Sequence, residues 1–128
     1  PTDTTLAAGS LLFGGVLSRH PGLRVALLHG GGFLPYQLGR LSHGWSVRPE
    51  PRRHLDRDPR ELLSQLWFDT LTHEAASLRF LRERVGTRRL CLGSDYPFDM
   101  ADPDPVGSVR RALDPADHDA VLDGVVVG

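Results

Sequence analysis

Three short apolar segments, each followed by a polar residue and then by a helical pattern, constrain the fold of this chain more than any other feature. The segments are RVALLH (24–29), LWFD (66–69) and RRLCLGSD (88–95). Apolar runs of this length, separated by helix-forming stretches, are typical of buried strands in a parallel sheet. We therefore predict an α/β fold with three adjacent parallel strands, at about 24–29, 65–69 and 88–93, and with the helices on the outside.

Six helical patterns lie around these strands. The first places its apolar residues from Leu6 to Leu17 on one face, with Asp3 or Thr4 as its cap. The next two begin near Pro35 and directly after Asp58, which is predicted to cap its helix. The remaining three lie at about 72–86, 106–113 and 114–124. The polar, proline-broken stretch 46–60 is predicted to be a loop.

Each predicted strand ends on a residue that can do chemistry: His29, Asp69 and Asp95. Catalytic groups gather at the carboxyl ends of parallel strands, so we expect His29 and Asp95 to converge there. Glycines 30–32 leave room for backbone and substrate beside His29. Asp69 precedes two threonines, and for it we favour a helix cap over a catalytic role. Asp95, taken alone, also suits a turn before the Tyr96–Pro97 pair.

Three motifs carry a resemblance to a known family. HGGGFLPYQLGRLSHGW (29–45), FDTLTHEAASLRFLRERVG (68–86) and LGSDYPFD (92–99) resemble the amidohydrolase-related family of metal-dependent decarboxylases. The resemblance runs from about residue 4 to residue 122, with the motifs in the family's order. It implies the C-terminal portion of a (β/α)8 TIM barrel, so that residues 1–128 form a partial amidohydrolase-related domain without strands one to five.

The resemblance also implies a site. His29 matches the histidine that handles the proton of a metal-bound water, and Asp95 matches an aspartate that binds the metal, zinc or another divalent ion. Arg40 matches an arginine that reaches a substrate carboxylate across a subunit interface. These matches imply a decarboxylase for a small carboxylated substrate, working as a homodimer.

The family's His-x-His metal ligands have no counterpart in this sequence. Because a zinc site needs at least three protein ligands, we expect weak or absent metal binding and an inactive C-terminal fragment. Two alternatives stay open: a metal-dependent hydrolase of the same family, and a non-catalytic remnant or subunit that pairs with a partner chain.

Composition argues against other partners. The net charge is −1, and the arginines between Arg48 and Arg60 alternate with acidic residues, so no nucleic-acid partner is expected. The longest apolar stretches, such as Leu11 to Leu17, are too short to cross a membrane. Cys91 is the one cysteine, which favours a cytoplasmic location. Four other histidines are expected to be surface or capping residues: His43, His54, His73 and His118.

Overall fold

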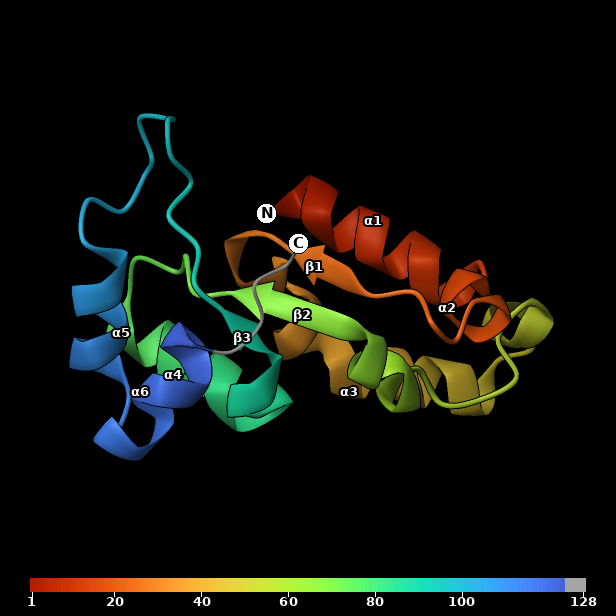
Figure 1. Cartoon of the computed structure of the whole chain (residues 1–128). Coiled ribbons are helices and arrows are strands. Elements are labelled where there is room, and N and C mark those ends of the chain that lie inside the picture. The colour runs from red at the N-terminus through yellow and green to blue at the C-terminus, as the bar shows by residue number, and fades with distance from the viewer. Residues whose placement is uncertain (124–128) are drawn as a thin grey trace. The chain divides into compact units, whose positions relative to one another are not determined.

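The computed structural model describes residues 1–123, which form two compact units (Figure 1). The first unit comprises Pro1–Leu27 and Gly31–Trp67, and the described part of the second comprises Leu28–Gly30 and residues 68–123. The expectation of one partial domain over residues 1–128 stays a prediction.

The three predicted strands form one sheet. Their bounds are β1 (Val25–Leu27), β2 (Leu66–Asp69) and β3 (Leu90–Cys91). The sheet order is β1-β2-β3, as predicted, and β2 and β3 run parallel with Asp69 opposite Cys91. Each strand is shorter than predicted. At the end of β1 the cause is visible, because His29 already begins a 3₁₀ turn, η1 (His29–Gly31).

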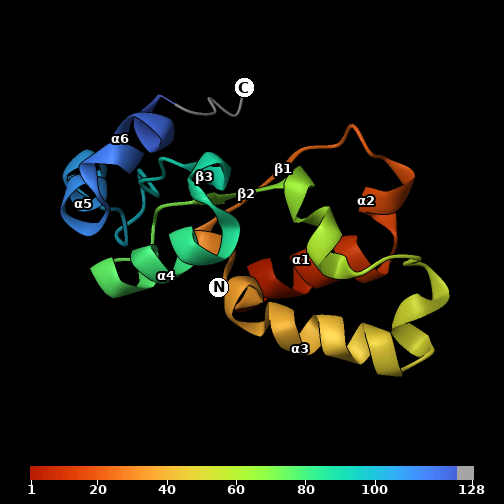
Figure 2. The ribbon, with the colours of Figure 1, turned by 90° about the horizontal axis from the view of Figure 1, so that it is seen from below.

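The first unit is built from helices that surround a leucine core. They are α1 (Thr2–Phe13), α2 (Val16–Arg19), α3 (Leu34–Val47), η2 (Glu50–Arg53) and η3 (Pro59–Gln65). Figure 2 shows α1 beside α3, and the two helices are in contact. The side chains of Leu12, Leu17 and Leu34 are fully buried there.

Three predictions for the first unit were wrong in detail. The first helix is divided, because Gly15 adopts a left-handed φ of 70° and a side chain there would collide with the His54 carbonyl oxygen. That helix begins after Pro1 with no side-chain cap, and Leu6 is 65% exposed rather than part of the buried face. The predicted loop 46–60 contains η2, and the element after Asp58 is a 3₁₀ helix.

The second unit holds the last three helices and β3. They are α4 (Ala75–Val85), the short η4 (Thr87–Arg89), α5 (Pro105–Ala112) and α6 (Pro115–Leu122). Helix α5 packs against α4 and α6, and α6 also contacts β3 (Figure 1). Leu78 and Leu81 bury one face of α4, and Gly86 ends the helix with a positive φ of 81°, both as predicted.

Asp58 is the most connected carboxylate of the first unit. Its side chain accepts a hydrogen bond from the Ser42 hydroxyl at 2.6 Å and from the Arg60 backbone N–H at 2.9 Å. The Arg60 guanidinium also lies 2.7 Å from it. The hydrogen bond from the Arg60 side chain, with the one from Ser42, lowers the pKa of Asp58 from 3.8 to about 2. This carboxylate therefore caps η3 and also connects it to α3.

We predict that Asp58→Ala lowers the free energy of unfolding by about 1–2 kcal/mol near neutral pH, the usual cost of losing a helix cap and a charge-assisted hydrogen bond. A lowered folded-state pKa stabilises the fold above the unfolded value of 3.8 and stops doing so as pH falls through about 2. The difference from the wild-type chain should therefore shrink in acid. Urea denaturation at neutral and acidic pH measures it.

The matched control is Asp56→Ala. Asp56 pairs only with its neighbour Arg57, and both side chains are well exposed, at 71% and 48%. Exposed pairs of this kind contribute little, so the control should unfold like the wild-type chain. Equal losses in the two variants would contradict the assignment of Asp58 as a cap.

Candidate active site

His29 and Asp95 lie together in the second unit, in the loops that follow β1 and β3. His29 Nε2 is 3.9 Å from Asp95 Oδ1, which is closer than the separation of roughly 6–8 Å expected of two residues that share a metal or water. Their side chains are 35% and 18% exposed, so a small molecule in solution can reach both. The predicted convergence is confirmed, while the catalytic roles of the two residues stay predictions.

Both residues have unusual backbone conformations. The φ angles of His29 and Asp95 are 56° and 59°, and His73, in the loop after β2, has a φ of 56°. A left-handed conformation costs a non-glycine residue roughly 1–2 kcal/mol and persists only where its surroundings enforce it. Such strain gathers at active sites, and here it occurs in all three loops that follow the strands.

Asp69 does not cap the following helix, so that prediction was wrong. Helix α4 begins at Ala75, and its cap is Glu74, whose carboxylate accepts a hydrogen bond from the Ala76 N–H at 3.4 Å. Asp69 is instead buried, with 4% of its surface exposed, and its Oδ1 accepts hydrogen bonds from Gly30 N–H at 2.7 Å and Leu71 N–H at 3.2 Å. Burial raises the pKa of Asp69, against the opposing effect of backbone hydrogen bonds from Gly30, His29 and Leu71.

A sequence signal for this role exists in hindsight. Asp69 ends the segment LWFD, every residue of which is buried, and β2 is the middle strand of the sheet. A carboxylate at the end of a central, fully buried strand has the loops of its neighbouring strands as its nearest source of hydrogen bonds. The two threonines that follow suggested a helix start instead.

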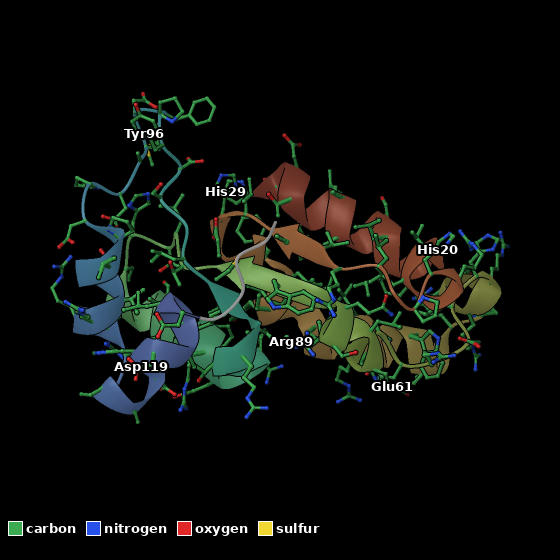
Figure 3. All side chains as sticks on the ribbon, viewed as in Figure 1. His20, His29, Glu61, Arg89, Tyr96 and Asp119 are labelled. Atoms are coloured by element: carbon green, nitrogen blue, oxygen red, sulfur yellow. The ribbon has the colours of Figure 1, made fainter. Side chains whose placement is uncertain are left out.

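Asp95 also fits the alternative considered for it, a turn. Its carbonyl oxygen accepts a hydrogen bond from Phe98 N–H at 3.0 Å. The loop beyond it exposes three large apolar side chains to solvent, those of Tyr96, Phe98 and Met100, by 84%, 67% and 62%. Figure 3 shows His29 in the loop after β1 and Tyr96 at the tip of the loop after β3. Asp95 therefore begins a turn, and exposed aromatic residues follow it in the chain.

Arg40 belongs to the first unit, on α3, where it is exposed. It lines a surface groove of about 610 Å³ together with apolar residues such as Phe13 and Val47. The predicted role of Arg40 in holding a substrate carboxylate stays a prediction.

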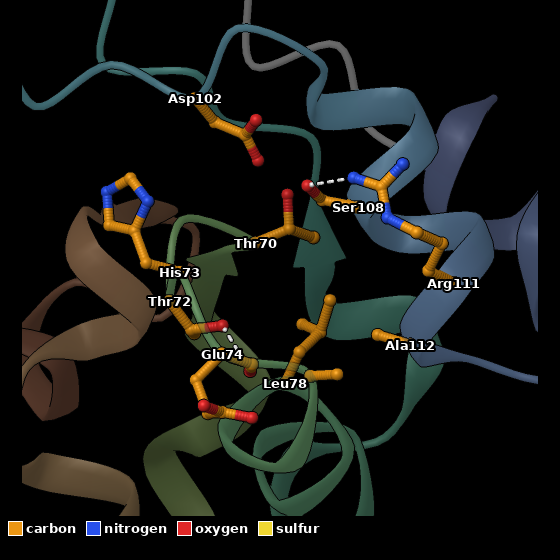
Figure 4. A pocket seen from close by; sticks show the side chains of 10 residues that line it. Thr70, Thr72, His73, Glu74, Leu78, Asp102, Ser108, Arg111 and Ala112 are labelled. Atoms are coloured by element: carbon orange, nitrogen blue, oxygen red, sulfur yellow. Dashed lines mark hydrogen bonds between the residues drawn. The ribbon is translucent and has the colours of Figure 1, made fainter.

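A separate cavity of about 310 Å³ lies between the start of α4 and α5 (Figure 4). Polar groups from His73, Asp102 and Ser108 face it. The one guanidinium that lines it, that of Arg111, already donates hydrogen bonds to Asp104 at 2.9 Å and to Ser108 at 3.1 Å. His73 is exposed, as expected of a surface histidine, although it also borders this cavity.

The described residues alone do not fit a resident metal ion. Within residues 1–123, no group of three or more His, Cys, Asp or Glu side chains is arranged to hold one. His29 and Asp95 offer two groups, whereas catalytic metal sites of the zinc type use three protein ligands.

A family model described as amidohydrolase matches residues 1–124. The chain belongs to the amidohydrolase family. This amidohydrolase chain is 40% identical over 103 residues to 2-amino-3-carboxymuconate-6-semialdehyde decarboxylase of Dictyostelium discoideum. The match covers 80% of the chain and 29% of that relative, so the chain spans under a third of the relative's length.

Solved structures of the family share the fold. A 5-carboxyvanillate decarboxylase from Sphingomonas paucimobilis matches with a TM-score of 0.76 and 28% identity, over 91% of this chain and 36% of that one. A dihydroxybenzoic acid decarboxylase from Polaromonas sp. JS666, with bound manganese and an inhibitor, has the same TM-score at 20% identity, again over 91% and 36%. The amidohydrolase chain thus has the fold of one portion of a TIM-type α/β barrel. Within residues 1–123, none of its helices has the length and apolar character needed to cross a membrane.

The turn at His29 gives a test of the local geometry. Gly30 has a φ of 61°, and an added Cβ would lie 3.0 Å from the Thr72 methyl group. We predict that Gly30→Ala lowers the free energy of unfolding by about 1–2 kcal/mol, the cost of a left-handed conformation for a residue with a side chain. Thermal and urea unfolding of the purified variant measure this loss.

Gly39→Ala is the control for this substitution. Gly39 lies within α3, and a Cβ there would meet no atom within 4 Å. Alanine favours helix over glycine, so this variant should be more stable by about 0.5–1 kcal/mol. If both alanines stabilise the chain, Gly30 does not need its left-handed conformation and the described turn is wrong.

Proposed function

We propose that this amidohydrolase chain supplies one part of the active site of a decarboxylase that acts on a small carboxylated substrate. In this proposal His29 carries a proton and Asp95 is one ligand of a divalent metal. The observation that carries the proposal is the 3.9 Å separation of His29 Nε2 and Asp95 Oδ1 in the loops that follow two strands of the sheet. The names of the relatives, decarboxylases of carboxylated muconate and aromatic acids, support the substrate class.

Decarboxylation needs a group that moves a proton. When the carbon–carbon bond to the carboxylate breaks, its electron pair stays on the substrate carbon, and a proton must take the place of carbon dioxide. An imidazole is the side chain best suited to exchange protons near neutral pH. His29 is partly exposed, and its Nε2 lies 3.9 Å from the Asp95 carboxylate, so substrate and solvent can both reach the imidazole.

A divalent metal, when bound, supplies a concentrated positive charge that polarises a substrate oxygen and acidifies water. Manganese is present in the Polaromonas decarboxylase, and either manganese or zinc is compatible with a carboxylate ligand such as Asp95. The two described groups are too few for a site. We therefore propose that the remaining ligands come from a barrel portion outside this chain, and that the chain alone is inactive.

Arg40 is proposed to bind the substrate carboxylate. A guanidinium holds a carboxylate through two parallel hydrogen bonds, and the exposed Arg40 lines a largely apolar groove. As the family resemblance implies, Arg40 would serve the site of a second copy in a homodimer.

A cytoplasmic location is part of the proposal. The one cysteine, Cys91, is free and buried, and burial, together with the nearby charge of Asp69, raises its pKa to about 11. A buried thiol with a raised pKa reacts poorly in disulfide exchange. A free cysteine of this kind is compatible with a reducing compartment.

Mixing the chain with the amino-terminal part of the Dictyostelium relative, in the presence of manganese or zinc, tests the function. We predict release of carbon dioxide from a carboxylated semialdehyde or a hydroxylated aromatic acid by the mixture, and none by this chain alone. His29→Ala should lower kcat by roughly 10²–10⁴-fold, the usual contribution of a general acid or base. Asp95→Ala should lower both metal content and turnover.

Asp119→Ala is the matched control, because Asp119 is an exposed carboxylate on α6. It should leave turnover unchanged. Full turnover in the mixture with Asp95→Ala would contradict the proposed site, and one tightly held zinc with turnover in this chain alone would contradict its incompleteness. Amide or ester hydrolysis without carbon dioxide release would favour the hydrolase of the same family instead.

A further inference from the structure

The buried carboxylate of Asp69 contacts the loops that carry the two residues of the candidate site. Its Oδ1 accepts a hydrogen bond from the backbone of Gly30, which directly follows His29, at 2.7 Å. Hydrogen bonds to an ionised acceptor are about twice as strong as neutral ones, and burial shields this one from water. The strongest described contact of Asp69 therefore acts on the turn that carries the candidate proton carrier.

The loop after β3 packs against the same carboxylate. A Cβ added to Gly93 would lie 2.7 Å from Asp69 Cβ and 2.9 Å from its Oδ2, so only glycine allows this approach. Gly93 N–H also donates to the Thr70 hydroxyl at 3.2 Å. Gly93 stands two residues before Asp95 in the chain. Asp69 thus contacts the residue that follows His29 and a residue two positions before Asp95.

The turn at His29 requires an external interaction to hold it. His29 and Gly30 both have left-handed φ angles, 56° and 61°, and the first of these is unfavourable for a residue with a side chain. The Gly30 N–H points to Asp69 in this conformation, and the hydrogen bond is present only while the turn is formed. The carboxylate and the strained turn are therefore coupled.

We propose that Asp69 is a positioning residue that holds the His29–Gly30 turn and, through it, keeps the His29 imidazole beside Asp95. This inference rests on the proposed function of His29, because positioning matters to catalysis only if His29 carries a proton. Asp69 is too deeply buried to contact substrate itself, since only 4% of its surface is exposed.

Asp117 is the second buried carboxylate among the described residues of this unit, and its partners lie away from the candidate site. Asp117 is 9% exposed and binds side chains remote in sequence from the site: the Arg82 guanidinium at 2.9 Å and the Thr87 hydroxyl at 2.8 Å. Removal of Asp117 should therefore destabilise the unit without any change at His29. It is the matched control for Asp69.

The experiment is NMR on the isotopically labelled chain, with amide hydrogen exchange at Gly30 and the ring signals of His29 as readouts. Asp69→Asn keeps an acceptor oxygen but loses the charge, so Gly30 exchange should rise roughly tenfold while the His29 signals stay near their wild-type positions. Asp69→Ala loses the acceptor, so exchange should rise roughly a hundredfold and the His29 ring signals should shift. Gly93→Ala, which crowds Asp69 without changing it, should shift the same signals and serves if Asp69→Ala does not fold. Asp117→Ala should lower Tm and leave both readouts unchanged once corrected for global stability.

Unchanged Gly30 exchange and His29 signals in Asp69→Ala, or in Gly93→Ala, would overturn the positioning role.

In the active mixture, Asp69→Ala should lower kcat at least tenfold with little change in KM, and Asp69→Asn should restore most of the lost kcat. Absence of decarboxylation in the wild-type mixture would refute the proposed function but not the coupling seen by NMR. A wild-type rate in Asp69→Ala would refute the inference and leave the function in place.

Discussion

The hydrogen bonds of one buried carboxylate, Asp69, underlie the arrangement of the strand ends in the second unit. A buried charge must be satisfied by hydrogen bonds, and the partners that the fold supplies are backbone N–H groups, at Gly30 and Leu71. Those N–H groups can reach the carboxylate only if the adjoining loops turn sharply. The left-handed conformation of His29 and the close approach of Gly93 both accompany this requirement. The geometry of the candidate site is thus a consequence of how one acid is buried.

Much of the fold was predictable because its signals are local. Apolar runs, proline and glycine positions, and the leucines of α4 identified the strand order and most helices, and the polar strand ends identified His29 and Asp95 as neighbours. Other features depend on contacts that a sequence pattern does not contain. The division of the first helix at Gly15 depends on the distant His54 carbonyl, and the role of Asp69 depends on loops that follow two other strands.

The chain that carries the candidate site spans only part of the length of its relatives. The chain spans about 29% of its Dictyostelium relative and 36% of the 5-carboxyvanillate decarboxylase, and its described residues bring His29 and Asp95 together. The loop that carries Asp95 also exposes the side chains of Tyr96, Phe98 and Met100. Both features are compatible with the proposal that other residues complete the site.

The loops after β1 and β3 hold the side chains of His29 and Asp95 next to each other. Nuclear Overhauser effects between the His29 ring protons and the Asp95 β-protons in the labelled chain test this arrangement most directly. Weak cross-peaks are expected, because His29 Nε2 and Asp95 Oδ1 are 3.9 Å apart and the protons on neighbouring carbons lie somewhat farther from each other. Cross-peaks from the His29 ring to other residues, with none to Asp95, would show that the two side chains do not share a site and would contradict the account.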